Sequence, residues 1–220
     1  MGNRRLLHMD GARPFPASII SLSPSDGSVK RALNELVGLI PVTGQARRRI
    51  VDRSPNHASV VLWIEAGERR ILLGADLEHS GVNAEGWLAV LANLQDKTRA
   101  GLFKVPHHGS PNADLKDVWS TMLVDEPIAV VTPFRGGKGL PQQTDLDRLK
   151  SRTPHLYLTA TGPGKAPRRD RAVERAVEGL AKKRRIIEGQ PGHVRVRWSM
   201  SNRSSQPQVE LFNGAQLVSR

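Results

Sequence analysis

Two short segments of the sequence carry side chains that can bind a metal ion or transfer a proton. The run 72–76, Leu-Leu-Gly-Ala-Asp, ends in the carboxylate of Asp76, and the run 103–110 reads Phe-Lys-Val-Pro-His-His-Gly-Ser. Asp76 cannot belong to a core, because a buried carboxylate without a partner is costly. At the carboxyl end of a strand, this side chain could bridge metal ions or cap the segment that follows it.

The two adjacent imidazoles, His107 and His108, stand where a strand is expected to run into a turn. Adjacent side chains diverge in extended backbone, so both rings are not expected to face one metal ion. One ring is then a metal ligand and the other a group behind the ligand or an acid/base catalyst, and the sequence leaves open which is which. Gly109 lets the backbone turn sharply, and Ser110 can cap the next segment and is expected to border the site.

Two more polar segments could border such a site. Asn56 and Ser59 stand at the start of a β-rich run, where they could equally form an ordinary turn. The run 132–139, Thr-Pro-Phe-Arg-Gly-Gly-Lys-Gly, follows an expected strand but lacks the glycine-to-lysine spacing of a phosphate-binding P-loop. It is therefore predicted to be a surface loop near the site. The absence of a nucleophile-elbow pattern disfavours a serine hydrolase.

The elements that must position these residues follow an α/β pattern. Two β-rich runs, 58–65 and 69–74, are separated by Ala-Gly-Glu and predict a hairpin. Their nearly continuous apolar residues indicate a sheet covered on both faces. After the hairpin, helical patterns over 87–94, 115–123 and 146–150 alternate with strand patterns over 102–105, 128–131 and 156–158. This alternation predicts an α/β fold.

The flanking regions are more irregular. We expect a strand over 18–22, a helix that begins near Asp26 and ends before Pro41, and a loop over 41–57. Near the other end we expect a basic amphipathic helix over 171–183 and a hairpin of 193–198 with 209–212. These expectations divide the chain into an irregular segment 1–17, a main domain 18–200 and a terminal strand and tail 201–220. The run 163–169 is the expected hinge or surface loop.

The composition limits the classes of protein to which the chain can belong. The 220 residues contain no cysteine, so any metal must be held by His, Asp or Glu. No run of about 18 apolar residues predicts a membrane span, and no apolar stretch of signal-peptide length follows Arg4 and Arg5. We therefore expect a soluble, cytoplasmic protein.

The formal net charge of +12 is concentrated at the two ends of the chain. Residues 1–60 have a net charge of +5, residues 61–160 of −1 and residues 161–220 of +8. Basic flanks of this kind could attract nucleic acid, or they could form a solubilising surface. Because the basic runs lack interleaved aromatic residues that stack on bases, the sequence favours the solubilising role.

The motifs in combination resemble the metallo-β-lactamase superfamily. Asn-x-x-Ser at Asn56 and Ser59, Gly-Ala-Asp ending at Asp76, and Lys-Val-Pro-His-His-Gly-Ser over 104–110 occur in the order and at the spacing of that family. The likeness is greatest to the domain attached to DNA-uptake competence proteins of the ComEC type, and it covers most of residues 18–200. The His-His-Gly-Ser motif is the most specific part of it.

The resemblance implies a fold and a site. It implies an αββα sandwich of two similar halves with one or two metal ions, zinc or manganese, between the sheet edges. Asp76 then matches the acid that bridges the metals, one of His107 and His108 matches the late histidine ligand, and Asn56 and Ser59 match positions that border the site. Such a metal would lower the pKa of bound water toward about 7 for attack on an ester or phosphoester.

The sequence departs from the family in one respect that affects function. The family's first half supplies a His-x-His-x-Asp-His cluster, and no such sequence occurs here. A catalytic zinc normally takes three protein ligands and a water, more than the late motifs provide. We therefore expect a partial αββα sandwich, completed by a separately encoded N-terminal half, by self-association or by rearranged packing of residues 1–50. A truncated gene product or a wrongly assigned start codon would give the same sequence.

Three functions remain open at this point. The first is a metal-dependent hydrolase of phosphodiester or similar ester bonds, inactive until the missing ligands are supplied. The second is a catalytically inert module that binds nucleic acid or protein through its basic flanks. The third is a structural fragment without activity, because a fold does not by itself determine a function.

Overall fold

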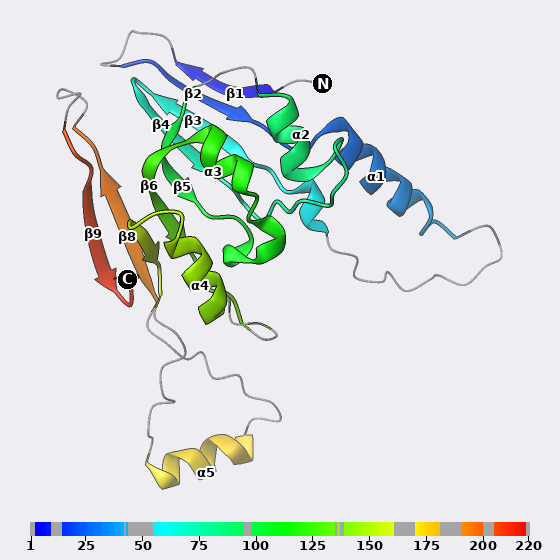
Figure 1. Cartoon of the computed structure of the whole chain (residues 1–220). Coiled ribbons are helices and arrows are strands. Elements are labelled where there is room, and N and C mark those ends of the chain that lie inside the picture. The colour runs from blue at the N-terminus through cyan, green and yellow to red at the C-terminus, as the bar shows by residue number, and fades with distance from the viewer. Residues whose placement is uncertain are drawn as a thin grey trace.

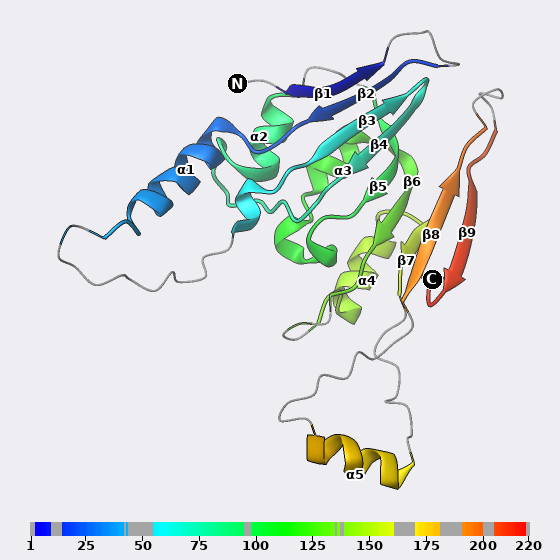
Figure 2. The same ribbon diagram turned by 180° about the vertical axis from the view of Figure 1, so that it is seen from behind.

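The computed structural model of the chain describes residues 3–9, 15–41, 43, 55–94, 98–134, 136, 139–160, 170–180, 191–199 and 205–218. In these residues a large mixed sheet carries helices on one face, and a two-stranded hairpin lies beside it (Figures 1 and 2). The prediction of an α/β fold is confirmed.

The main sheet has eight strands, in the order β1-β2-β3-β4-β5-β6-β7-β10. They are β1 (Arg4–Met9), β2 (Ala17–Ser21), β3 (Leu62–Ala66), β4 (Arg69–Leu73), β5 (Ala100–Lys104), β6 (Leu123–Val131), β7 (Leu156–Leu158) and β10 (Gln216–Leu217). Neighbours from β1 to β4 are antiparallel, those from β4 to β7 are parallel, and β10 is antiparallel to β7. The parallel part follows from the alternation of helices and strands, because parallel neighbours need a crossover.

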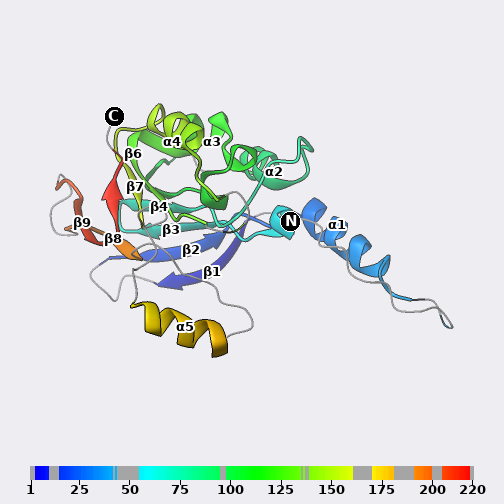
Figure 3. The ribbon, with the colours of Figure 1, turned by 90° about the horizontal axis from the view of Figure 1, so that it is seen from below.

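Three helices cover one face of this sheet (Figure 3): α2 (Gly86–Ala92), α3 (Lys116–Met122) and α4 (Gln143–Lys150). The strands present to them a continuous row of cross-strand partners that are at most 5% exposed: Trp63, Leu72, Phe103, Ala129 and Leu156. The helices contribute Trp87, Val118, Met122 and Leu149, all at most 2% exposed. The core therefore lies between the sheet and these helices.

The opposite face of the sheet is less covered. Its matching row of cross-strand partners consists of Ile19, Ile64, Ile71 and Leu102, which are only partly buried, and Ile128, which is 6% exposed. Among the described residues, the prediction of a sheet covered on both faces is thus correct for the helix side alone.

The predicted terminal hairpin is confirmed as β8 (Gly192–Arg197) and β9 (Gln208–Asn213). Among the described residues, the Gly192 backbone N–H donates to Thr159 O directly after β7 (2.9 Å), and Arg69 Nη2 on β4 donates to Ser205 O shortly before β9 (3.2 Å). The predicted tail 201–220 contributes a further short strand, β10, to the main sheet.

The N-terminal region corrects one prediction. Residues 1–17 were expected to be irregular, but residues 4–9 form β1, which pairs with β2 at the edge of the sheet. Leu6 and Leu7 are 58% and 44% exposed. An edge strand with little burial has no apolar alternation, which is why the sequence pattern does not reveal it.

The helix predicted to begin near Asp26 is confirmed as α1 (Asp26–Val37), but it ends four residues before Pro41. Ser25 caps it, since its side chain accepts a hydrogen bond from the Ser28 N–H (3.1 Å). Its apolar side chains are 39% to 69% exposed at Val29, Leu33, Leu36, Val37 and the following Ile40. The helix points away from the sheet (Figure 1), so its apolar stripe does not join the core.

The first strand of the predicted hairpin begins later than expected. A short 3-10 helix spans Pro55–Ala58, and β3 starts at Leu62 in place of residue 58. The Val61 backbone N–H donates instead to the Ser23 hydroxyl (2.8 Å), so a side chain replaces the strand partner there. The expected loop over 41–57 lies largely outside the described residues.

The last helix, α5, spans Arg171–Leu180; residues 181–183 of the predicted helix and the predicted hinge over 163–169 lie outside the described residues. None of the helices in the described ranges is long and apolar enough to cross a membrane.

Candidate functional site

The fold brings Asp76 and the two histidines to one edge of the sheet. Strands β4 and β5 are parallel neighbours, so their carboxyl ends lie side by side. Beyond the strands, the Gly74 N–H donates to Lys104 O and the His107 N–H donates to Ala75 O, both at 3.0 Å. These two bonds hold the two motif segments together.

Close packing and unusual backbone conformations mark this edge. A Cβ at Gly74 would lie 2.9 Å from Lys104 O and from Pro106 Cβ, so glycine is needed for the two segments to approach. Ala75, His107 and His108 all have positive φ, at 48°, 43° and 54°. Each such residue costs about 1–3 kcal/mol, and conformations of this kind cluster at functional sites.

His108 faces Asp76. Its Nδ1 lies 2.7 Å from Thr132 O, and because a carbonyl can only accept, Nδ1 carries the proton. The lone pair of the neutral ring is then on Nε2, which lies 3.9 Å from Asp76 Oδ1. Two ligands of a tetrahedral zinc ion, at bond lengths of about 2.0–2.1 Å, lie about 3.4 Å apart, so the pair needs to close by about 0.5 Å.

His107 has different partners, and its ring centroid lies 6.2 Å from that of His108. Its Nδ1 is 2.9 Å from Glu78 Oε1 and 3.3 Å from Asn112 Oδ1, and its Nε2 is 3.3 Å from Asn56 Nδ2. Both ring nitrogens therefore contact protein groups. The expected divergence of the two imidazoles is observed, and the ring that turns toward Asp76 is that of His108.

Glu78 is the site residue that the sequence analysis missed. Its Oε1 accepts a hydrogen bond from Asn56 Nδ2 (2.8 Å) and lies 2.9 Å from His107 Nδ1, so one carboxylate contacts two other segments of the chain. The available signal was Asp-Leu-Glu over 76–78, which places a second acid two residues after Asp76. The resemblance to the metallo-β-lactamase superfamily assigns a role to the first acid alone.

The three residues expected to border the site behave differently. Asn56 lies in the site, bonded to Glu78. Ser59 contacts its surroundings through its backbone, since its N–H donates to Asn56 O (3.2 Å) and its carbonyl accepts from the Ser23 hydroxyl (2.6 Å). Ser110 occupies the N-cap position of the short 3-10 helix Pro111–Ala113 but forms no side-chain cap bond, so the prediction that it caps this segment is wrong.

The loop after β6 lies at the site, in line with its prediction. Thr132 supplies the carbonyl that holds His108, and the Phe134 ring stacks on the His108 ring with centroids 5.1 Å apart. Gly137 and Lys138 of this loop lie outside the described residues.

A cluster of buried charged side chains holds the histidine turn, residues 107–109, in place. Arg148 on α4 donates to Asp114 Oδ2 (2.7 Å), to Asp145 Oδ1 (2.8 Å) and to Gly109 O (2.6 Å). The side chains of Asp114 and Asp145 are 2% and 4% exposed, and Asp114 also accepts from Trp119 Nε1 (2.6 Å). The cluster fixes the turn because the Gly109 carbonyl is one of its members.

Lys104 places a cation near Asp76. Its Nζ donates to Val105 O (3.1 Å) at the end of β5. Burial lowers the pKa of the Lys104 ammonium, and attraction to the Asp76 carboxylate opposes this effect. The lysine therefore balances part of the Asp76 charge at this edge.

These residues fall short of a complete metal centre. In the described part of the chain, no group of three His, Cys, Asp or Glu side chains is placed to hold a metal ion. Asp76 and His108 provide two donors, whereas a catalytic zinc takes three. We therefore derive no reaction step through a metal held by this pair alone.

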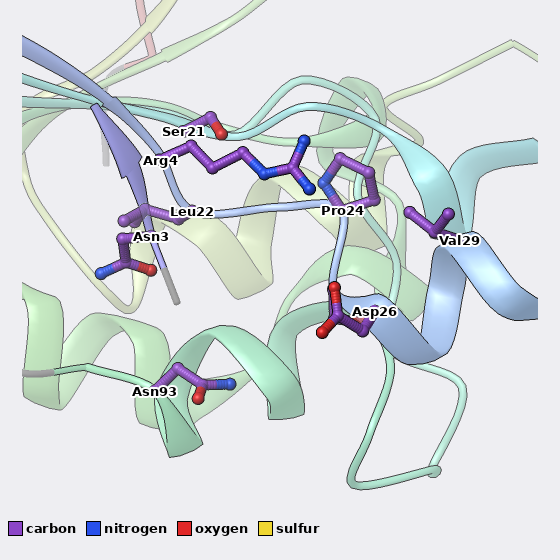
Figure 4. A pocket seen from close by; sticks show the side chains of 9 residues that line it. Asn3, Arg4, Ser21, Leu22, Pro24, Asp26, Val29 and Asn93 are labelled. Atoms are coloured by element: carbon purple, nitrogen blue, oxygen red, sulfur yellow. The ribbon is translucent and has the colours of Figure 1, made fainter. Parts of the chain in front are cut away.

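A small cavity of about 70 Å³ lies elsewhere, between the β2–α1 connection and the ends of β1 and α2 (Figure 4). Its lining includes Asn3, Arg4, Asp26 and Asn93, and the Arg4 side chain extends toward Pro24. The cavity is separate from the edge that carries Asp76 and His108.

Comparison of the chain with models of protein families, with curated proteins and with solved structures found no match in any of the three.

Proposed function

We propose that this chain supplies half of the metal site of a metallo-β-lactamase-fold hydrolase that acts on phosphodiester or similar ester bonds. The observation that carries the proposal is the geometry of His108. Its Nδ1 is bonded to Thr132 O, which leaves the lone pair on Nε2, 3.9 Å from Asp76 Oδ1. A histidine whose second nitrogen is held by a backbone carbonyl is the usual arrangement of a metal ligand.

The surroundings of the pair support the same proposal. The Asp76 and His108 segments leave parallel neighbouring strands, and in the described part of the chain α2, α3 and α4 cover one face of the sheet, as in one layer pair of an αββα sandwich. The partly buried row of Ile19, Ile64, Ile71 and Leu102 on the other face offers an apolar surface for a second sheet. A separately encoded half, or a second copy of this chain, would pack there.

The other site residues take roles that do not require a metal. Glu78 and Asn56 contact the two ring nitrogens of His107, and a carboxylate 2.9 Å from an imidazole nitrogen is suited to orienting the ring for proton transfer. In this proposal His108 and Asp76 bind the metal, zinc or manganese, and His107 is the acid/base residue beside them. The missing histidines of the partner segment would complete the coordination.

Zinc titration by calorimetry tests the half-site. A structural zinc site contributes about 10–16 kcal/mol, and roughly half of that, about 5–8 kcal/mol, corresponds to a Kd between roughly 1 and 200 µM. We expect affinity in this range for the unmodified chain, loss of binding in Asp76→Ala and in His108→Ala, and retained binding in His107→Ala.

Two results of this titration would count against the proposal. Nanomolar zinc binding by the isolated chain would mean that the site is already complete. Binding that survives both Asp76→Ala and His108→Ala would mean that the pair is not the metal site.

A further inference from the structure

The aromatic ring of Phe134 lies against the imidazole of His108. The two ring centroids are 5.1 Å apart, and the ring planes are 26° from parallel. Phe134 is 49% exposed, so burial in the core does not explain why an aromatic residue stands here.

The backbone around Phe134 is held by several bonds. Its N–H donates to Leu140 O and its carbonyl accepts from the Leu140 N–H, both at 2.8 Å. Gly139 has a φ of +76°, and its carbonyl accepts a hydrogen bond from Gln142 Nε2 (2.6 Å). A Cβ at Gly136 would collide with the outer edge of the Phe134 ring, so this glycine packs directly against the ring. The ring is thus confined between Gly136 and His108.

One loop therefore constrains His108 in two directions. Thr132 O binds Nδ1 within the plane of the imidazole, and the Phe134 ring two residues later limits the tilt of that plane. A single hydrogen bond leaves the ring free to rock about the bond axis, whereas a hydrogen bond combined with a stacked neighbour does not. The direction of Nε2 toward Asp76 depends on both contacts.

We propose that Phe134 is a positioning residue, which holds the His108 imidazole with Nε2 directed at Asp76 and forms an aromatic wall beside this pair. The consequence for metal binding rests on the proposed function, but the effect on the imidazole does not.

The test uses nitrogen-15 NMR of the histidine rings of the full chain, at alkaline pH, with Phe134→Leu and Phe134→Tyr. In the unmodified chain we expect His108 to be protonated at Nδ1 alone. In Phe134→Leu we expect the Nε2-protonated form to appear and the zinc affinity to fall roughly threefold to tenfold, which is the range expected for loss of one aromatic contact. Phe134→Tyr keeps the aromatic stack, so this variant should show the same His108 tautomer and zinc affinity as the unmodified chain.

The chain offers a matched control. His193 and Phe212 form a second histidine–phenylalanine stack on the terminal hairpin, with centroids 4.3 Å apart. Phe212→Leu should change the ring signals of His193 and leave those of His108 unchanged. Gly136→Ala, which displaces the Phe134 ring without removing it, should reproduce the effect of Phe134→Leu on His108.

The outcomes separate the two proposals. If His108 keeps its single tautomer in both Phe134→Leu and Gly136→Ala, the positioning role is overturned. If the His108 signals change in these variants while the unmodified chain binds no zinc through Asp76 and His108, the positioning role stands and the proposed function fails.

Discussion

Replacing Arg148 by methionine is expected to lower the free energy of unfolding by about 3–5 kcal/mol, because the change removes the cation bonded to two buried carboxylates and leaves Asp114 only the more distant Arg152, at 3.8 Å. Asp114 and Asp145 are 2% and 4% exposed, and Arg148 donates to both. The guanidinium also donates to Gly109 O, so the histidine turn loses its support in the same variant. Urea denaturation followed by tryptophan fluorescence measures the change.

Lys150→Met is the matched control, on the same helix. Lys150 Nζ lies 3.3 Å from Asp147 Oδ1, but the Asp147 side chain is 58% exposed, so this pair should contribute at most about 1 kcal/mol. If Arg148→Met and Lys150→Met lower the free energy of unfolding equally, the buried cluster contributes no more to stability than the exposed ion pair.

Replacing Phe103 by alanine should lower the free energy of unfolding by about 3–5 kcal/mol, through loss of apolar burial and creation of a cavity. Phe103 is 1% exposed and forms edge-to-face contacts with Trp119 at 5.1 Å and with Trp87 at 6.5 Å between ring centroids. Phe103 lies near the end of β5, which leads to His107. The cavity would therefore form in the core close to the candidate site.

Phe103→Leu serves as the control for cavity size. Leucine fills most of the space of the phenylalanine ring. This variant should therefore lower the free energy of unfolding by about half as much as Phe103→Ala or less, measured by the same urea titration. A loss below about 1 kcal/mol in the alanine variant would mean that the helices α2 and α3 are not packed on the sheet as described.

Much of the central fold follows from sequence pattern alone. The helices α2, α3 and α4 and the strands β5 and β7 lie within a few residues of their predicted positions, because apolar periodicity there reflects real burial. The pattern misses β1 for the same physical reason, because β1 is an exposed edge strand without alternation. It does predict the helix α1, although the described residues leave the apolar stripe of that helix exposed.

The sequence predicts which segments form the candidate site, but not which of their atoms make contact. The motif positions of Asp76 and His107–His108 predict that these residues share one edge of the sheet, and they do so because parallel neighbouring strands end on the same side. Which imidazole turns toward Asp76 depends on Thr132 O, a backbone atom with no sequence signature. The roles of Glu78 and Arg148 depend on contacts between segments 22 to 39 residues apart, which local pattern does not report.

Nitrogen-15 NMR of the imidazole rings during a zinc titration shows whether Asp76 and His108 bind the metal, because it reports which nitrogen atom the zinc contacts. We expect that the resonance of His108 Nε2 shifts on addition of zinc, that His107 is unaffected, and that Asp76→Ala abolishes the response. A zinc-dependent shift at His107, or no shift at either ring at millimolar zinc, would contradict this expectation.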